Sequence, residues 1–184
     1  MTTLTFIARR TVLAVGTALV AASATSSVLA ASTAAWPTKP VRIVVGFPGG
    51  SSPDLTARTF SEPLSKLLGQ PVIVENKVGA GGNIGATEVA RAHDNHTIGL
   101  MINGNMTIAK ILNPATPYDP LKDLAPLTLI GVSPLVLTAP VEQPGVPKDA
   151  DAKAFFAAAQ KAGDKWSYGT PGVGTIGHLG TELL

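Results

Sequence analysis

The sequence predicts an α/β protein built around a parallel sheet. Three short apolar runs alternate with two helical patterns between residues 41 and 102, in the order strand, helix, strand, helix, strand. This order is typical of parallel strands joined by helices that cover the sheet. Apolar residues make up 45% of the 184 residues, a proportion that supports a packed core.

Composition excludes several classes of site. The chain has no cysteine, so disulfide scaffolds, Cys-ligated zinc, iron–sulfur clusters and thiol catalysis are ruled out. The formal net charge of +2 arises from Arg9 and Arg10, because without this pair the 14 basic residues fall to 12, equal to the 12 acidic ones. No stretch of Lys and Arg interleaved with aromatic residues follows, so we expect no nucleic-acid partner.

Residues 1–30 have the pattern of a cleaved export signal. A polar start ends in Arg9-Arg10, residues 11–24 are small and apolar, and Val28-Leu29-Ala30 fits a signal peptidase site. The apolar run is shorter than the roughly 18 residues that a membrane span requires. We therefore expect export to the periplasm, and the arginine pair fits both the Sec and the twin-arginine routes. A buried N-terminal helix is the alternative.

Local patterns define the helices and strands expected in the first half of the chain. A helix over residues 52–68 would have Ser52 as its N-cap, Pro53 in its first turn and Gly69 as its stop. A second helix over residues 84–92 would have Asn83 as its N-cap. The expected strands lie at residues 41–46, 72–75 and 97–102.

The second half of the chain continues the alternation more loosely. Strands are expected at residues 135–139 and 166–170, and helices at residues 149–162 and 175–184. The last helical pattern reaches the end of the chain without a stop signal, whereas a strand and helix usually lead into a further strand. We therefore expect a sequence that is cut short within a second domain.

Three glycine-rich loops, at residues 47–54, 79–85 and 172–177, each join a predicted strand or turn to a predicted helix. Such loops offer backbone N–H groups at the positive end of a helix dipole, which suits a carboxylate or a phosphate. Ordinary helix caps are the alternative explanation. In the second loop the glycines exceed what a cap requires, which indicates close approach by a ligand or by another backbone.

The third loop also matches the dinucleotide pattern G-x-G-x-x-G. The acidic residue that should follow about 20 positions later would fall beyond residue 184. Catalysis has no other support, since the chain lacks a nucleophile elbow and His178 stands alone. His93 and His96 read as a polar turn and lack the spacing of helical metal ligands. We therefore expect a binding protein for a small anion, without enzyme activity, metal or cofactor.

Ordered motifs along residues 36–184 resemble the Bug-type solute receptors, the periplasmic substrate-binding proteins of tripartite tricarboxylate transporters. The matching motifs are Trp36-Pro37-Thr38-Lys39-Pro40 with Val41-Arg42-Ile43-Val44-Val45, Phe47-Pro48-x-Gly50 with Asp54 and Arg58, Gly79-Ala80-Gly81-Gly82-Asn83-Ile84-Gly85, Tyr118-Asp119-Pro120, and Tyr168-Gly169-Thr170 with Gly172, Gly174 and His178.

The resemblance implies a two-domain, Venus-flytrap α/β fold that is truncated within its second domain, with a first domain over residues 31–130 and the start of a second over residues 131–184. It also implies capture of a small carboxylate between loops 47–54 and 170–175, and delivery of that ligand to membrane permease subunits. The residues implied to bind the ligand are Phe47, Gly49, Gly50, Ser51, Ser52, Asp54, Asn83, Asn103, Thr170, Gly172, Gly174, Thr175 and His178.

Two departures from the family pattern limit what is carried over. Pro53 stands in the first loop and removes a backbone donor there. The chain resembles only about the first half of a family member, so a non-functional truncated fragment of such a receptor is the main alternative. An enzyme domain that binds the phosphate of a nucleotide is the weaker alternative.

Overall fold

The structure is a computed structural model that describes residues 35–184, in which Lys39–Leu184 form one compact unit. The export signal expected at residues 1–30 lies outside the described residues. Within the described part of the chain, no helix combines the length and the apolar character needed to cross a bilayer.

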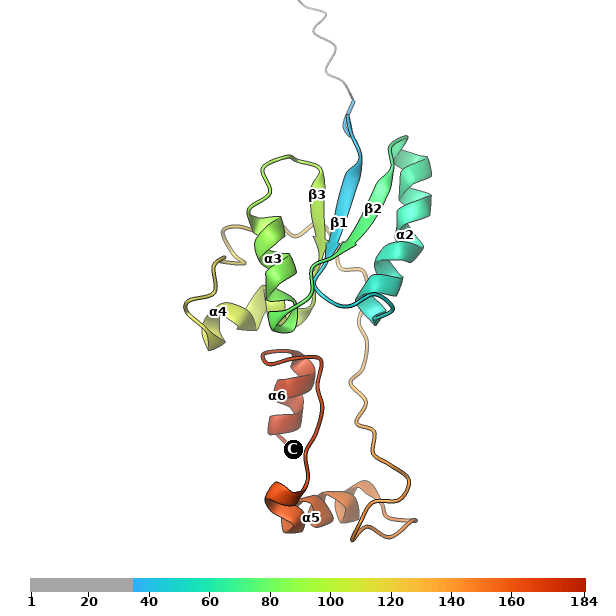
Figure 1. Cartoon of the computed structure of the whole chain (residues 1–184), viewed down its shortest axis with the longest axis vertical. Helices are drawn as coiled ribbons and strands as arrows, with labels where there is room; N and C mark the ends of the chain where they lie inside the picture. Colours follow the sequence, from blue (N-terminus) through green and yellow to red (C-terminus); the bar gives the residue numbers. More distant parts are fainter. Residues whose placement is uncertain (1–34) are drawn as a thin grey trace, which may run out of the picture. The chain divides into compact units, whose positions relative to one another are not determined.

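Three parallel strands form the sheet: β1 (Val41–Val45), β2 (Val72–Asn76) and β3 (Thr97–Leu100), in the order β2-β1-β3 (Figure 1). The central strand β1 pairs on both sides, and its Arg42 lies opposite Ile73 of β2 and Thr97 of β3. Because β1 is hydrogen-bonded on both edges and covered on both faces, its run of β-branched residues is buried. The expected strand–helix–strand–helix–strand order is confirmed.

Helices α2 (Ser52–Leu68) and α3 (Asn83–Ala90) flank the sheet (Figure 1). Ile43 and Val45 of β1 pack in one cluster with Ala57 of α2. Arg42 of β1 contacts Glu88 of α3. Since alternate residues of a strand point to opposite faces, the two helices cover opposite faces of the sheet, as a doubly wound fold requires.

Both expected N-caps are wrong by one residue. The N-cap of α2 is Ser51 instead of Ser52, while Gly69 ends the helix in the left-handed conformation as expected. The N-cap of α3 is Gly82 instead of Asn83. The reason at α3 is a short 3-10 turn, η1 (Ala80–Gly82), that precedes the helix. Its final glycine adopts a left-handed φ of 93°, so the helix already begins at Asn83.

The chain after β3 is less regular. It forms a π-helical turn η2 (Gly104–Ile108) and the short helix α4 (Ala109–Leu112), and then runs irregularly to α5 (Ala152–Ala162). A 3-10 turn η3 (Gly163–Lys165) and helix α6 (Ile176–Glu182) follow. Both expected helices are therefore present, although the first begins at Ala152 instead of residue 149 and the second ends at Glu182 instead of residue 184. The side chains of Asp151 and Thr175 act as their N-caps.

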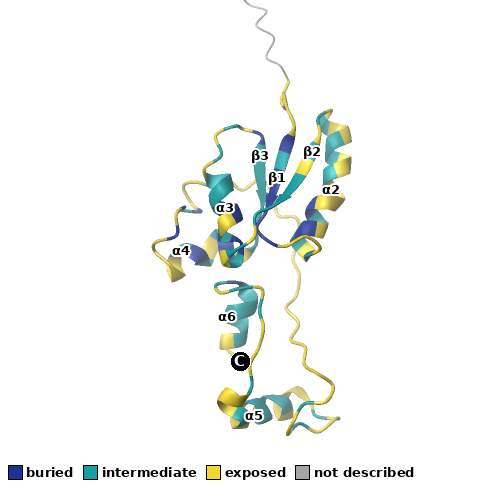
Figure 2. Ribbon diagram, viewed as in Figure 1, coloured by how far each residue is buried: buried dark blue, intermediate teal, exposed yellow. Residues whose placement is uncertain are grey.

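The strands expected at residues 135–139 and 166–170 are wrong, because neither segment forms a strand or pairs with one in the structure. A strand requires a neighbour that satisfies its N–H and C=O groups, and the sheet of the described residues contains only β1, β2 and β3. The apolar side chains of Leu135, Val136 and Leu137 are exposed as a result. Figure 2 shows the long exposed connection between α4 and α5.

Candidate ligand-binding site

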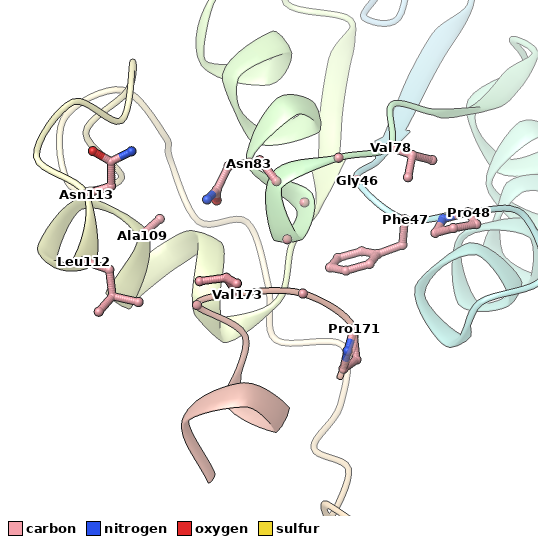
Figure 3. Close-up of a pocket in the computed structure, with 16 residues that line it drawn as sticks. Gly46, Phe47, Pro48, Val78, Asn83, Ala109, Leu112, Asn113, Pro171 and Val173 are labelled. Atoms are coloured by element: carbon pink, nitrogen blue, oxygen red, sulfur yellow. The ribbon is translucent and has the colours of Figure 1, made fainter. Parts of the chain in front are cut away.

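Three glycine-rich loops meet around a cavity of about 560 Å³, which we call the loop cavity (Figure 3). The first loop follows β1, the second leads into α3, and the third leads into α6. Helix α4 completes the wall. The lining residues are Gly46, Phe47, Pro48, Val78, Gly79, Ala80, Gly81, Gly82, Asn83, Ala109, Leu112, Asn113, Pro171, Gly172, Val173 and Gly174.

Glycines allow these loops to pack backbone against backbone. A Cβ atom on Gly46 would lie only 2.6 Å from the Cα and carbonyl oxygen of Gly82. A Cβ atom on Gly81 would lie 2.8 Å from the carbonyl oxygen of Val173, and one on Gly104 would lie 2.6 Å from that of Gly174. These distances leave no room for a side chain. Of the two explanations left open by the second loop, close approach by another backbone is therefore the one that the structure shows.

Asp54 holds the first loop in shape. Its carboxylate is 1% exposed and accepts hydrogen bonds from Gly50 N (2.8 Å), Asn76 Nδ2 (2.8 Å) and Arg58 Nε (3.0 Å). The Arg58 guanidinium, the Gly50 amide and the Asn76 amide together hold the pKa of Asp54 well below its ordinary value. Asn76 Nδ2 also donates to the carbonyl oxygen of Phe47 at 2.9 Å. Through this one carboxylate, strand β2 (at Asn76) and helix α2 (at Arg58) are both bonded to the first loop.

Asn83, Asn105 and Tyr118 form a buried polar cluster behind the second loop. Asn105 Nδ2 donates to Asn83 Oδ1 (2.8 Å) and to the carbonyl oxygen of Gly81 (3.0 Å). The Tyr118 hydroxyl lies 2.9 Å from Asn83 Oδ1 and 2.8 Å from the carbonyl oxygen of Asn105, so its single proton is shared between two acceptors. Asn105 and Tyr118 are 1% and 2% exposed, and burial raises the pKa of the Tyr118 hydroxyl.

Three hydroxyl and imidazole side chains shape the third loop. Thr175 Oγ1 donates to the carbonyl oxygen of Gly172 at 2.7 Å and accepts from His178 N at 3.3 Å, which caps α6. Thr170 Oγ1 accepts from Gly172 N at 3.4 Å, and His178 Nδ1 accepts from Gly174 N at 3.5 Å. These side chains therefore turn toward the loop's own backbone, and Thr175 is buried.

The structure divides the predicted ligand residues into two groups. Four of them line the loop cavity: Phe47, Asn83, Gly172 and Gly174. Nine lie outside its lining: Gly49, Gly50, Ser51, Ser52, Asp54, Asn103, Thr170, Thr175 and His178. Among the nine, the Ser51 hydroxyl oxygen is buried and has no hydrogen-bond partner among residues 35–184.

The resemblance implied a ligand contact at Asn103, directly after the third strand, but sequence reasoning missed the residues that follow it in this segment. Ala109, Leu112 and Asn113 line the cavity, and Asn105 and Tyr118 support it from behind. This segment lacks periodicity, because it folds as a π-helical turn followed by a single short helix. The usable signal was the polar pair Asn103 and Asn105 around Gly104, directly after a strand.

The loop cavity contains no ionised side chain in its lining, and its polar side chains are Asn83 and Asn113. A negative ligand group would therefore depend on backbone N–H groups, the start of α3 and an amide NH₂ group. Within residues 35–184, no group of three or more His, Asp or Glu side chains is placed to hold a metal ion. The arrangement is suited to binding, since neither a paired acid and base nor an activated nucleophile faces the cavity.

The fold and the loop cavity define a class of α/β solute receptors, and comparison with known proteins gives the family. Residues 56–184 match the tripartite tricarboxylate transporter family receptor, and the chain belongs to this family. The UPF0065 protein in the tcbD-tcbE intergenic region of Pseudomonas sp. (strain P51) is 37% identical over 179 residues, which is 97% of this chain and 51% of that protein. The protein BugT of Bordetella pertussis is 35% identical, covering 81% of this chain and 45% of BugT.

A solved structure supports the same assignment. R. palustris Rpa4515, determined with adipate, is 26% identical with a TM-score of 0.61, covering 80% of this chain and 48% of that one. The resemblance stated from the motifs is confirmed. The chain spans about half the length of the curated relatives it matches.

Proposed function

We propose that this chain belongs to a periplasmic receptor that captures a small carboxylate for a tripartite tricarboxylate transporter. The observation that carries the proposal is the family match over residues 56–184. Binding without chemistry agrees with the loop cavity, whose lining contains no ionised side chain. Permease subunits in the membrane are the partners that receive the ligand in this proposal.

The geometry of the site supports a carboxylate as the ligand group. The second loop brings the N-terminus of α3 to the cavity, where the helix dipole favours negative charge. A volume of about 560 Å³ is in the range of small-molecule sites. The related Rpa4515 was determined with adipate, a six-carbon dicarboxylate, which makes adipate the first ligand to test.

The proposed organisation keeps a first domain over residues 31–130 and a second that starts at residue 131, behind a cleaved signal at residues 1–30. The nucleotide alternative gains no support from the third loop. Gly172 packs there against the backbone of the second loop, since a Cβ atom on it would lie 3.0 Å from Gly81 Cα. Gly174 packs against the Leu112 side chain of α4. A phosphate would have to displace that contact.

Thermal melting of the 184-residue chain, purified from a periplasmic extract, tests the proposal. Adipate at about 100 times its dissociation constant should stabilise the protein by roughly 2.7 kcal/mol, seen by circular dichroism as a higher melting temperature. Hexane-1,6-diol is the matched control, since it has the same carbon chain without carboxylates. A cooperative melt that no dicarboxylate shifts would overturn the proposal. A melt without cooperativity would support the truncated-fragment alternative.

A further inference from the structure

We infer that Asn105 fixes the orientation of Asn83 so that the Asn83 NH₂ group is the side-chain donor presented to the loop cavity, where it selects ligand groups that accept hydrogen bonds. This inference rests on the proposed function and assigns a positioning role to Asn105 and Tyr118. Asn83 belongs to the lining of the cavity (Figure 3). Asn105 and Tyr118 are outside that lining and contact Asn83 Oδ1.

The orientation of Asn105 is set by backbone groups that cannot exchange roles. Its Nδ2 lies 3.0 Å from the carbonyl oxygen of Gly81, which can only accept, and its Oδ1 lies 3.4 Å from Ile102 N, which can only donate. Turning the amide over would place oxygen against oxygen and nitrogen against nitrogen in a buried site. The orientation of the Asn105 amide is therefore fixed, with its Nδ2 directed toward Gly81 and Asn83.

Asn83 must then present its oxygen to Asn105. Asn105 Nδ2 lies 2.8 Å from Asn83 Oδ1, and the Tyr118 hydroxyl reaches the same oxygen at 2.9 Å. If the Asn83 amide turned over, the contact with Asn105 would place donor against donor, so this contact sets the orientation. The Tyr118 hydroxyl, which can donate or accept, holds the position of the Asn83 side chain. Within residues 35–184, Asn83 Nδ2 donates to no acceptor of the protein, which leaves its two N–H groups for a ligand.

Two donors at a site without side-chain cations give a defined selectivity. A carboxylate offers acceptors only, and a hydrogen bond to an ionised acceptor is roughly twice as strong as a neutral one. The same NH₂ group meets a neutral amide less favourably, because that ligand brings donors of its own. The site should therefore prefer adipate over adipamide, which has the same carbon chain.

The variant Asn83→Asp tests the NH₂ group that we infer faces the cavity. Aspartate keeps an oxygen for Asn105 and Tyr118 and replaces the NH₂ group with a second oxygen. By isothermal titration calorimetry we expect the ratio of adipate affinity to adipamide affinity to fall by about tenfold or more. An unchanged ratio, in a variant that still binds, would overturn the selection by Asn83.

Two further variants test the positioning role. In Asn105→Asp the Asn83 amide should turn its NH₂ group toward the new carboxylate, so that adipate binding weakens by about tenfold. Tyr118→Phe removes one of the two contacts and should weaken binding by a smaller factor. Tyr168→Phe is the control, because Tyr168 is half exposed and lies outside the cavity lining. Equal effects of Tyr118→Phe and Tyr168→Phe would count against the positioning of Asn83 by Tyr118.

Hydrogen exchange of the side-chain amides, followed by NMR in the ligand-free protein, separates this inference from the proposed function. We expect the Asn105 NH₂ protons to be protected and the Asn83 NH₂ protons to exchange rapidly. In Asn105→Asp the Asn83 protons should become protected. The reverse pattern in the unsubstituted protein would overturn the orientation even if adipate binds. Failure to bind any dicarboxylate, with the expected exchange pattern, would overturn the proposed function and leave the orientation established.

Discussion

Asp54 has a different role from the one that its position in the sequence indicates. A carboxylate at the start of a helix, beside two glycines and two serines, reads as part of a ligand loop. In the structure it is buried and bonded to Gly50, Arg58 and Asn76. A ligand carboxylate would be repelled by this charge if it were not neutralised by the guanidinium of Arg58. Asp54 therefore holds the first loop in shape.

Acid should weaken the fold through Asp54. In the folded protein, Arg58, Gly50 N and Asn76 lower the pKa of the Asp54 carboxyl. In an unfolded chain the pKa of an aspartate is about 3.9. The ionised group therefore stabilises the protein above that pH, and the contribution is lost as the pH falls below it toward the folded pKa. Urea unfolding at a series of pH values measures the loss.

The control for this titration is Asp54→Asn, which should be less stable at neutral pH and lose this part of the pH dependence. Glu62→Gln should retain it, because Glu62 is exposed and forms only a surface pair with Lys66. Parallel curves for the unsubstituted protein and Asp54→Asn would show that the acid sensitivity arises elsewhere.

At the scale of elements, the site depends on where loops can touch. The end of β1, the start of α3 and the loop before α6 meet through glycine backbones, so closely that a Cβ atom at Gly46 or Gly81 would lie within 3 Å of the neighbouring backbone. Such packing fixes the mutual placement of the loops without using side chains. Because the walls of the loop cavity are these same loops, its volume depends on glycine at the contact points.

Gly46→Ala should destabilise the protein by about 1–3 kcal/mol, the usual range for forcing a methyl group into packed structure. The new Cβ would lie 2.6 Å from two backbone atoms of Gly82, which cannot move aside as a side chain can. Urea unfolding followed by circular dichroism measures the change. Gly131→Ala is the matched control, since nothing lies within 4 Å of its Cβ position. Equal stability of the two variants would contradict the backbone contact.

At the scale of the whole molecule, burial and strand pairing are unevenly distributed over the described residues. The buried clusters are formed by the sheet, Phe47, helices α2, α3 and α4, and Tyr118. The connection from residue 127 to residue 141, in contrast, has unpaired backbone and exposed apolar side chains (Figure 2). Leu127, Leu129 and Val132 are 76%, 79% and 89% exposed. Local opening requires little free energy where few contacts and no strand pairing have to be broken.

Limited digestion with thermolysin, which cuts before bulky apolar residues, should therefore cleave first between Leu127 and Val141. The expected early product retains β1, β2, β3, α2 and α3, identified by mass spectrometry. Val44 and Val45 are the internal control, because they are fully buried in the central strand and should resist cleavage until the fold is lost. First cuts within β1 or α2 would contradict this distribution of stability.

Much of the first half could be read from local pattern. The run Val41–Val45 is β-branched and buried at every position except Arg42, because both faces of the strand are covered, and this pattern is typical of a central parallel strand. Helix α2 is bounded by a proline in its first turn and by Gly69 at its end, both of which act locally. The glycines of the second loop likewise indicated close approach, and Gly81 and Gly82 lie there against the backbones of the other two loops.

Contacts between distant segments determined the rest. Asn83 has the residue type of an N-cap, yet its side chain is directed by Asn105 and Tyr118, which lie 22 and 35 positions away. Residues 135–139 have strand-like composition, but composition supplies no partner for their hydrogen bonds. Residue pattern thus determines periodicity, turns and caps to within a residue, because these depend on neighbours in the chain. Strand pairing, the direction of a buried amide and the walls of the cavity depend on which segments meet in space.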